Sequence, residues 1–164
     1  MRYGDVRALE FQDGYFDGCF SLGVIEHVWE GYDAIIKEMY RTLKQYGYAF
    51  LSFPCISPLD NIKIMLSGYE IFSGSEKPHN FYQFALDIQE VKKDCESIGF
   101  RCISNQRQYG LSGMQRVIPA FKPVSEWLWA ASRKSIITKT FTVAISCILQ
   151  PLCGLSAMLV LKKQ

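Results

Sequence analysis

The side chains that could carry chemistry in this chain are few, and most of them lie within the first 27 residues. Asp5 stands where a preceding strand would end, so its carboxylate could accept a hydrogen bond from a ligand. A turn aspartate can equally cap its own backbone. His27 could orient a substrate or take up a proton near neutral pH, or it could bond to backbone at a helix start. The neighbouring Glu26 is better suited to ordering the loop.

The other reactive side chains lack the spacing of a metal site or of an activated nucleophile. Two histidines and six cysteines contain no Cys-x-x-Cys pair, so we expect no metal site. No serine or cysteine stands in a Gly-x-Ser-x-Gly turn. The chain opens without the pattern of a signal peptide, which favours reduced thiols and a cytoplasmic location.

The composition fits one globular domain and argues against a nucleic-acid partner. The chain has 164 residues, of which 49% are hydrophobic, enough for a substantial core. Its formal net charge is +2, and no cluster of Lys and Arg is interleaved with aromatic residues. The sequence indicates no oligomeric state.

The first half of the chain alternates between strand and helix patterns. Residues 16–25 form an apolar run typical of a strand buried on both faces. Residues 31–45 place apolar side chains at spacings of three and four, which predicts a helix. Asp33 is its expected N-cap, and Gly47 supplies the expected left-handed turn at its end. Residues 48–53 then predict a second buried strand.

The pattern continues into the second half of the chain. A short helix is expected near Ile62, followed by a loop that reaches Asn80. Residues 87–99 predict an amphipathic helix that ends at a glycine, and residues 100–104 predict a strand nearer a sheet edge. Alternating strands and helices indicate an α/β fold with parallel neighbouring strands.

The uncharged tail, residues 140–161, allows two interpretations. Its length is sufficient to cross a bilayer. Pro151 and Gly154 interrupt it, however, and proline costs about 3 kcal/mol inside a soluble helix. We therefore favour a helix to about Leu149, a Pro-Gly break, and a strand over residues 157–161. Membrane association through the tail remains the alternative.

Four passages occur in the order found in one enzyme family. The passage GDA-x-x-LPF-x-DGSFD of the type 11 methyltransferases is similar to residues 4–17. The family's strand end S-LGVLEHV resembles residues 21–28. Its RVLKPGG turn resembles residues 41–47, although a Gln-Tyr pair replaces the Pro and the first Gly. Residues 52–54 resemble the end of the next strand.

The resemblance implies a class I methyltransferase that uses S-adenosylmethionine as its cofactor. In that family the position of Asp5 accepts a hydrogen bond from the adenine amino group, and the backbone N–H of Val6 reaches a ring nitrogen. Ser21 and Leu22 correspond to contacts with the methionine part of the cofactor. His27 follows beside the place where the transferred methyl group would lie.

The resemblance also implies that part of the fold is missing. The family's glycine-rich DVGCGTG-like turn has no counterpart, because no Gly-x-Gly occurs in the chain. We therefore expect a partial Rossmann-like sheet, mostly parallel with an antiparallel final strand, flanked by helices and lacking its first strands. Residues 1–164 would form one domain, with a core in 1–56, a substrate-side segment in 57–125, and a hydrophobic helix and last strand in 126–164.

The expected function is methyl transfer from S-adenosylmethionine to a small-molecule or lipid-like acceptor. The alternative is a truncated, non-catalytic binding or scaffold module, which could associate with a membrane. Aromatic side chains could wall an apolar acceptor, although core packing is the more common role of such residues. These aromatic residues are Tyr69, Phe72, Phe81, Tyr82, Tyr109, Trp127 and Trp129.

Overall fold

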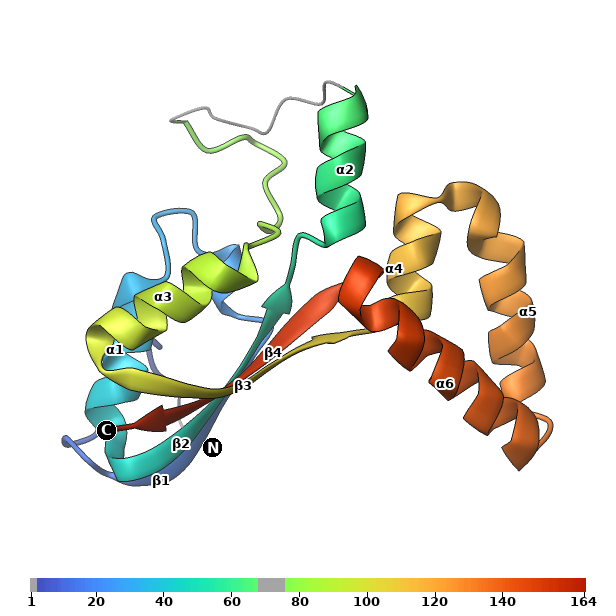
Figure 1. Cartoon of the computed structure of the whole chain (residues 1–164). Helices are drawn as coiled ribbons and strands as arrows, with labels where there is room; N and C mark the ends of the chain where they lie inside the picture. The colour runs from blue at the N-terminus through green and yellow to red at the C-terminus, as the bar shows by residue number, and fades with distance from the viewer. Residues whose placement is uncertain (1–2, 68–75) are drawn as a thin grey trace. The chain divides into compact units, whose positions relative to one another are not determined.

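The computed structural model describes residues 3–67 and 76–164, and these residues form two compact units (Figure 1). One unit comprises Met1–Pro54, Lys77–Gln106 and Ala157–Gln164; the other comprises Cys55–Glu76 and Arg107–Ser156. Tyr69 and Phe72 lie outside the described residues. The expected single domain with its three segments stays a prediction.

The first unit is built on a four-stranded mixed sheet in the order β1-β2-β4-β3. The strands are β1 (Phe16–Leu22), β2 (Leu43–Pro54), β3 (Phe100–Gln108) and β4 (Ser156–Lys163). β1 and β2 are parallel, and β4 runs against its neighbours (Figure 1). This arrangement confirms the expected α/β sheet with an antiparallel final strand.

Two helices, α1 (Asp33–Thr42) and α3 (Ile88–Ile98), lie on the same side of this sheet (Figure 1). Their apolar stripes and every second residue of β2 and β4 are buried, as the period of each element requires. The side chains of this core include Ile35, Ile36, Val91, Cys95, Ala49, Leu51, Phe53, Leu159 and Leu161.

The opposite face of the sheet keeps apolar side chains exposed. Phe20 on β1 is 71% exposed and stacks on Phe50 of β2 with ring centroids 4.7 Å apart. Leu22 and Tyr48 are exposed beside them. β1 is also an outer strand, with no neighbour on one side among the described residues. The expected burial of this strand on both faces is wrong, because no described element covers the face that carries Phe20. An edge of this kind favours association with other chains.

The ends of α3 are as expected, whereas those of α1 are not. Asp87 caps α3 by accepting hydrogen bonds from two backbone N–H groups, and Gly99 ends it in the left-handed conformation. Asp33 is the first residue of α1 rather than its N-cap, and that helix already ends at Thr42. Gly47 instead lies within β2. A Cβ atom there would lie 2.9 Å from the Lys44 carbonyl oxygen, so the irregular start of the strand requires the glycine.

The second unit is helical and consists of α2 (Pro58–Ser67), α4 (Gly110–Val117), α5 (Lys122–Ser132) and α6 (Ile136–Cys153), with the short turn η2 (Pro119–Phe121). α6 contacts the other three helices. The expected break near Leu149 is wrong, because α6 continues through Pro151 to Cys153. Pro151 falls in the last turn of α6 and has no backbone N–H to donate to the carbonyl four residues earlier. The expected strand after the helix is confirmed as β4.

Among the described residues, α6 is long and apolar enough to cross a membrane by length and composition alone. A core helix of a soluble protein can pass the same test, but only 17% of this helix window is buried.

Close packing of α4 on α6 predicts a strong effect of one added methyl group. A Cβ atom at Gly113 would collide with the backbone carbonyl of Cys153. We expect Gly113→Ala to lower the free energy of unfolding by about 3 kcal/mol, since overpacking forces the backbone to shift. Urea unfolding measured by circular dichroism checks this. Ser112→Ala on the same helix is the control, and equal midpoints for the two variants would contradict the packing.

Candidate functional site

The candidate site lies where the parallel strands β1 and β2 end. The backbone N–H of Gly23 donates to the Ser52 carbonyl at 3.0 Å, and the chain then leaves the sheet. Gly23 has a φ of 68°, a left-handed conformation that favours glycine. The sharp turn leaves Leu22 exposed and Ser21 buried. Ligands of open α/β sheets bind beyond such strand ends.

A short helical turn, η1 (Ile25–His27), follows at once and carries a buried carboxylate. Glu26 is only 3% exposed, and its Oε2 has no hydrogen-bond partner among the described residues. A Cβ atom at Gly23 would lie 3.4 Å from its Oε1, so the carboxylate lies against the turn after β1. Burying a carboxylate oxygen without a hydrogen-bond partner lowers the stability of the fold. Glu26 therefore offers a free acceptor directly behind the strand end.

His27 is held in one orientation by Tyr82. Its Nδ1 lies 2.7 Å from the carbonyl oxygen of Tyr82, and its ring packs edge-on against the Tyr82 ring. A carbonyl only accepts hydrogen bonds, so Nδ1 carries the proton and the neutral ring keeps its lone pair on Nε2. Nε2 lies 3.9 Å from Glu26 Oε1. His27 can therefore accept a proton, and the Glu26 carboxylate would stabilise the resulting cation.

An aromatic cluster borders the same turn. Trp29 stacks on Phe84 with ring centroids 5.3 Å apart and packs edge-on against Phe81 at 5.0 Å. The backbone N–H of Phe84 donates to the Glu26 carbonyl, and that of Leu86 donates to the Pro54 carbonyl. Residues 81–86 are thereby fixed beside both η1 and the end of β2. An apolar acceptor could contact these rings close to His27.

Asp5 and Val6 occupy a separate turn near the start of the chain. The Asp5 carboxylate accepts hydrogen bonds from the Arg7 side chain, at 2.8 Å from Nη2, and from the Arg7 backbone N–H. These bonds, the side-chain pair above all, lower the pKa of Asp5 to about 2. The carboxylate therefore stays ionised across the physiological range. The side chain of Val6 is exposed.

Two residues of α1 hold this N-terminal segment. Glu38 Oε1 accepts the backbone N–H of Leu9 at 2.6 Å. Arg41 donates to the Leu9 carbonyl at 3.1 Å, to Glu38, and to Asp13 at 2.6 Å. Sequence analysis missed this anchor. The available signal was an acidic and a basic side chain three residues apart on a predicted helix.

The structure thus brings Ser21, Leu22 and His27 together around one turn. Asp5 and Val6 lie in a turn that is closed by the hydrogen bond from the Ala8 N–H to the Asp5 carbonyl, and the following Leu9 bonds to α1. The roles of these five residues in cofactor binding or catalysis stay predictions.

Burial disfavours the reactive thiolate form of the cysteines in this unit. All six cysteines are free. Burial raises the pKa of Cys19 to about 11 and that of Cys95 to about 12. Both thiols therefore stay protonated near neutral pH, and the thiolate is the reactive form. The described residues contain no group of three or more His, Cys, Asp or Glu side chains that could hold a metal ion.

Residues 1–51 match the model of the methyltransferase domain family. No functionally curated protein matches the chain. Solved structures do match its fold. One is a putative sarcosine dimethylglycine methyltransferase from Galdieria sulphuraria, at a TM-score of 0.56 and 12% identity over 99% of this chain and 58% of that chain.

Two further structures are similar over nearly the whole chain. The [4+2]-cyclase SpnF matches at a TM-score of 0.54 and 15% identity, over 98% of this chain and 54% of the cyclase. A phosphoethanolamine N-methyltransferase from Haemonchus contortus, in complex with S-adenosyl-L-methionine, matches at a TM-score of 0.50 and 15% identity, over 97% of this chain and 36% of the enzyme. The chain has the fold of S-adenosylmethionine-dependent methyltransferases and spans a third to somewhat over half the length of these proteins.

The Arg41 anchor predicts unequal effects of two similar substitutions. We expect Arg41→Met to lower the free energy of unfolding by about 1–3 kcal/mol, because it leaves the nearly buried Glu38 carboxylate without its charged partner. Lys44→Met is the matched control, since its ion pair with Asp17 is exposed and contributes little. Urea unfolding compares the two variants, and trypsin cleavage after Arg7 should accelerate only in Arg41→Met. Equal stability and equal cleavage would show that the anchor is unimportant.

The contact with Tyr82 predicts the tautomer of His27. Long-range ¹H–¹⁵N correlation spectra of the neutral ring should show the proton on Nδ1, because the Tyr82 carbonyl can only accept it. The exposed His79 provides a reference in the same spectrum. A His27 ring protonated on Nε2 would contradict the geometry.

Proposed function

Because residues 1–51 match the methyltransferase domain and the chain has the corresponding fold, we propose that it acts in methyl transfer from S-adenosylmethionine to a small-molecule or lipid-like acceptor. The observation that supports this most is the turn after β1. There the exposed Leu22, the left-handed Gly23 and the oriented His27 meet beyond the ends of two parallel strands.

The residues present would hold part of the cofactor in this proposal. In this proposal the Asp5 carboxylate accepts a hydrogen bond from the adenine amino group. The backbone N–H of Val6 donates to a ring nitrogen of the adenine. A carboxylate has about four lone-pair positions, and the Arg7 groups do not use all of them. Ser21 and Leu22 contact the methionine part. When bound, the cofactor supplies an electrophilic methyl group on a sulfonium.

The acceptor side is assigned to η1 and the aromatic cluster of Trp29, Phe81 and Phe84. Methyl transfer is an in-line displacement, so positioning of the nucleophile supplies most of the rate. In this proposal the aromatic rings orient an apolar acceptor, and His27 Nε2 accepts a hydrogen bond or a proton from its nucleophilic atom.

The remaining cofactor contacts are proposed to come from outside these 164 residues. The chain contains no Gly-x-Gly turn and covers only 36–58% of the three solved structures described above. The free edge of the outer strand β1 offers a place for further strands, and the exposed Phe20 lies on a sheet face that further helices would cover. The same observations favour one alternative, a non-catalytic module that uses the uncovered sheet for binding.

Titration calorimetry with S-adenosylmethionine separates the two functions. We expect saturable binding by the 164-residue chain, strengthened when an in-frame upstream segment with a glycine-rich turn is included. Asp5→Ala should weaken binding about tenfold, because it removes a charged hydrogen bond of about 1.5 kcal/mol.

The matched control is Asp17→Ala, which removes another exposed aspartate paired with a basic side chain. It should leave the affinity unchanged. No binding by either form of the protein would favour the scaffold function, and equal losses in the two variants would remove Asp5 from the site.

A further inference from the structure

The long helix α6 has its polar and apolar faces reversed relative to a helix of a soluble domain. Along one stripe, Ile137 is 77% and Ile148 is 73% exposed, with Phe141 between them also exposed. On the opposite stripe, Thr142 and Ser146 are buried. A surface helix in water normally buries its apolar stripe and exposes its polar one. The outward face of α6 is therefore suited to an apolar environment.

The buried face of α6 is held by small residues and hydrogen bonds. Thr142 donates to the Leu128 carbonyl of α5 at 3.2 Å, and Ser146 accepts the Leu111 N–H of α4 at 3.4 Å. Gly110 of α4 lies so close to α6 that a Cβ atom would collide with the Ser146 carbonyl. Close contact through glycine and hydroxyl side chains is the packing that helices use in lipid, where apolar side chains face outward.

The charged side chains at the turn between α5 and α6 are all basic. After Glu126 the sequence contains five Lys and Arg residues and no Asp or Glu. Three of these cations, Arg133, Lys134 and Lys139, lie exposed at the turn between α5 and α6. Glu126 itself lies 3.8 Å from Lys122. An anionic surface would therefore meet no repelling carboxylate at this turn.

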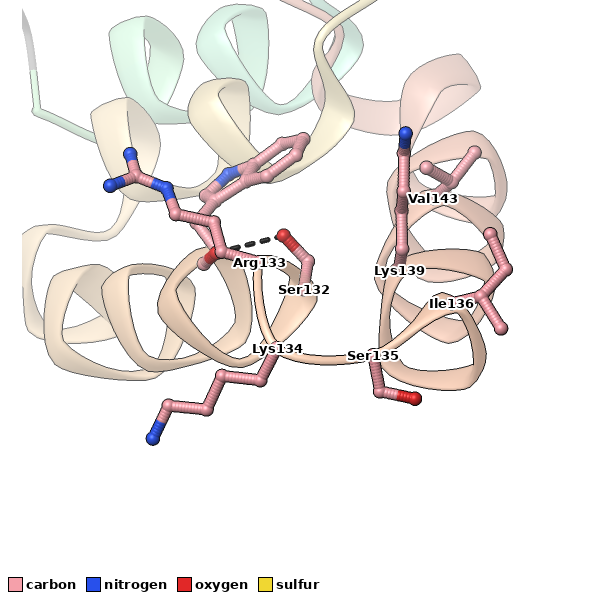
Figure 2. Close-up of a pocket in the computed structure, with 8 residues that line it drawn as sticks. Ser132, Arg133, Lys134, Ser135, Ile136, Lys139 and Val143 are labelled. Carbon is pink, nitrogen blue, oxygen red and sulfur yellow. Dashed lines mark hydrogen bonds between the residues drawn. The ribbon is translucent and has the colours of Figure 1, made fainter.

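The turn also forms an open hollow between the two helices. Figure 2 shows Arg133 and Lys139 projecting from opposite sides of it, with Ile136 and Val143 along α6. Trp129 of α5 also lines the hollow, and Trp127 of the same helix is exposed. Tryptophan, basic side chains and an apolar stripe together are the composition of helices that lie in a membrane interface.

We propose that the α5–α6 hairpin, residues 122–153, docks onto a bilayer that contains anionic lipids. The stripe of Ile137, Phe141 and Ile148 enters the interface, and the cations of the turn contact lipid phosphates. α6 lies in the plane of the membrane, because its other face is occupied by α4 and α5. The proposal does not depend on methyl transfer.

Vesicle flotation tests this docking. The full chain is synthesised in vitro in the presence of vesicles of phosphatidylcholine, alone or mixed with phosphatidylserine, and floated on a density gradient. We expect it to float with the mixed vesicles and to detach as ionic strength rises. Lys134→Glu with Lys139→Glu should weaken binding at least about 25-fold, because each cation lost costs roughly fivefold and the added carboxylates are repelled by the anionic lipid. Ile137→Ser with Phe141→Ser should weaken it about a hundredfold, because two apolar side chains leave the interface.

Matched controls change the same residue types in the sheet-containing unit. Lys93→Glu on α3 and Ile103→Ser on β3 are exposed and should leave flotation unchanged. A wild-type chain that floats with neither kind of vesicle overturns the proposal and assigns the stripe to a protein partner. Equal losses in the control and hairpin variants, or equal flotation with neutral and mixed vesicles, also overturn it.

Discussion

The hydrogen bond from Gly23 to the Ser52 carbonyl marks the point on which the candidate site depends. Because β1 and β2 are parallel, their carboxyl ends meet at one edge of the sheet, and the loops that follow must turn there. The left-handed Gly23 makes that turn abrupt enough to return Glu26 into the interior and to present His27 beside it. Without the pairing of β1 with β2, neither the Glu26 carboxylate nor the aromatic cluster of Trp29, Phe81 and Phe84 would lie at a strand end.

Each of the two compact units is stabilised internally by a different kind of interaction. The sheet-containing unit has an apolar core in which α1 and α3 contribute complete hydrophobic stripes, as a soluble α/β fold requires. The helical unit buries hydroxyl groups and glycine contacts and leaves apolar side chains outside. Apolar side chains therefore remain exposed on both units, on the sheet at Phe20 and on α6 at Ile148. Exposed apolar patches of this kind mark interaction sites.

Capping residues in the sequence predicted the ends of a helix only where neighbouring residues alone determine those ends. α3 begins and ends as predicted, because the Asp87 carboxylate and the conformation of Gly99 act within a few residues. α1 ends at Thr42, before the end that Gly47 predicted. The reason is that Leu43 is already paired with Phe16 of β1 in the sheet and is therefore extended. α6 continues past Pro151 and ends at Cys153, beside Gly154, so the proline signal misplaced the end of this helix by a few residues.

The sequence by itself determined the alternation of strands and helices and the order of the family's passages from Asp5 to His27. Both depend on residue types at short spacing. Only the tertiary structure decided that Tyr82 orients His27, that Arg41 anchors the segment carrying Asp5, and that α6 turns its apolar stripe outward. Each of these depends on residues far apart in the chain, or on which face of a helix is covered, and periodicity alone cannot distinguish an inward stripe from an outward one.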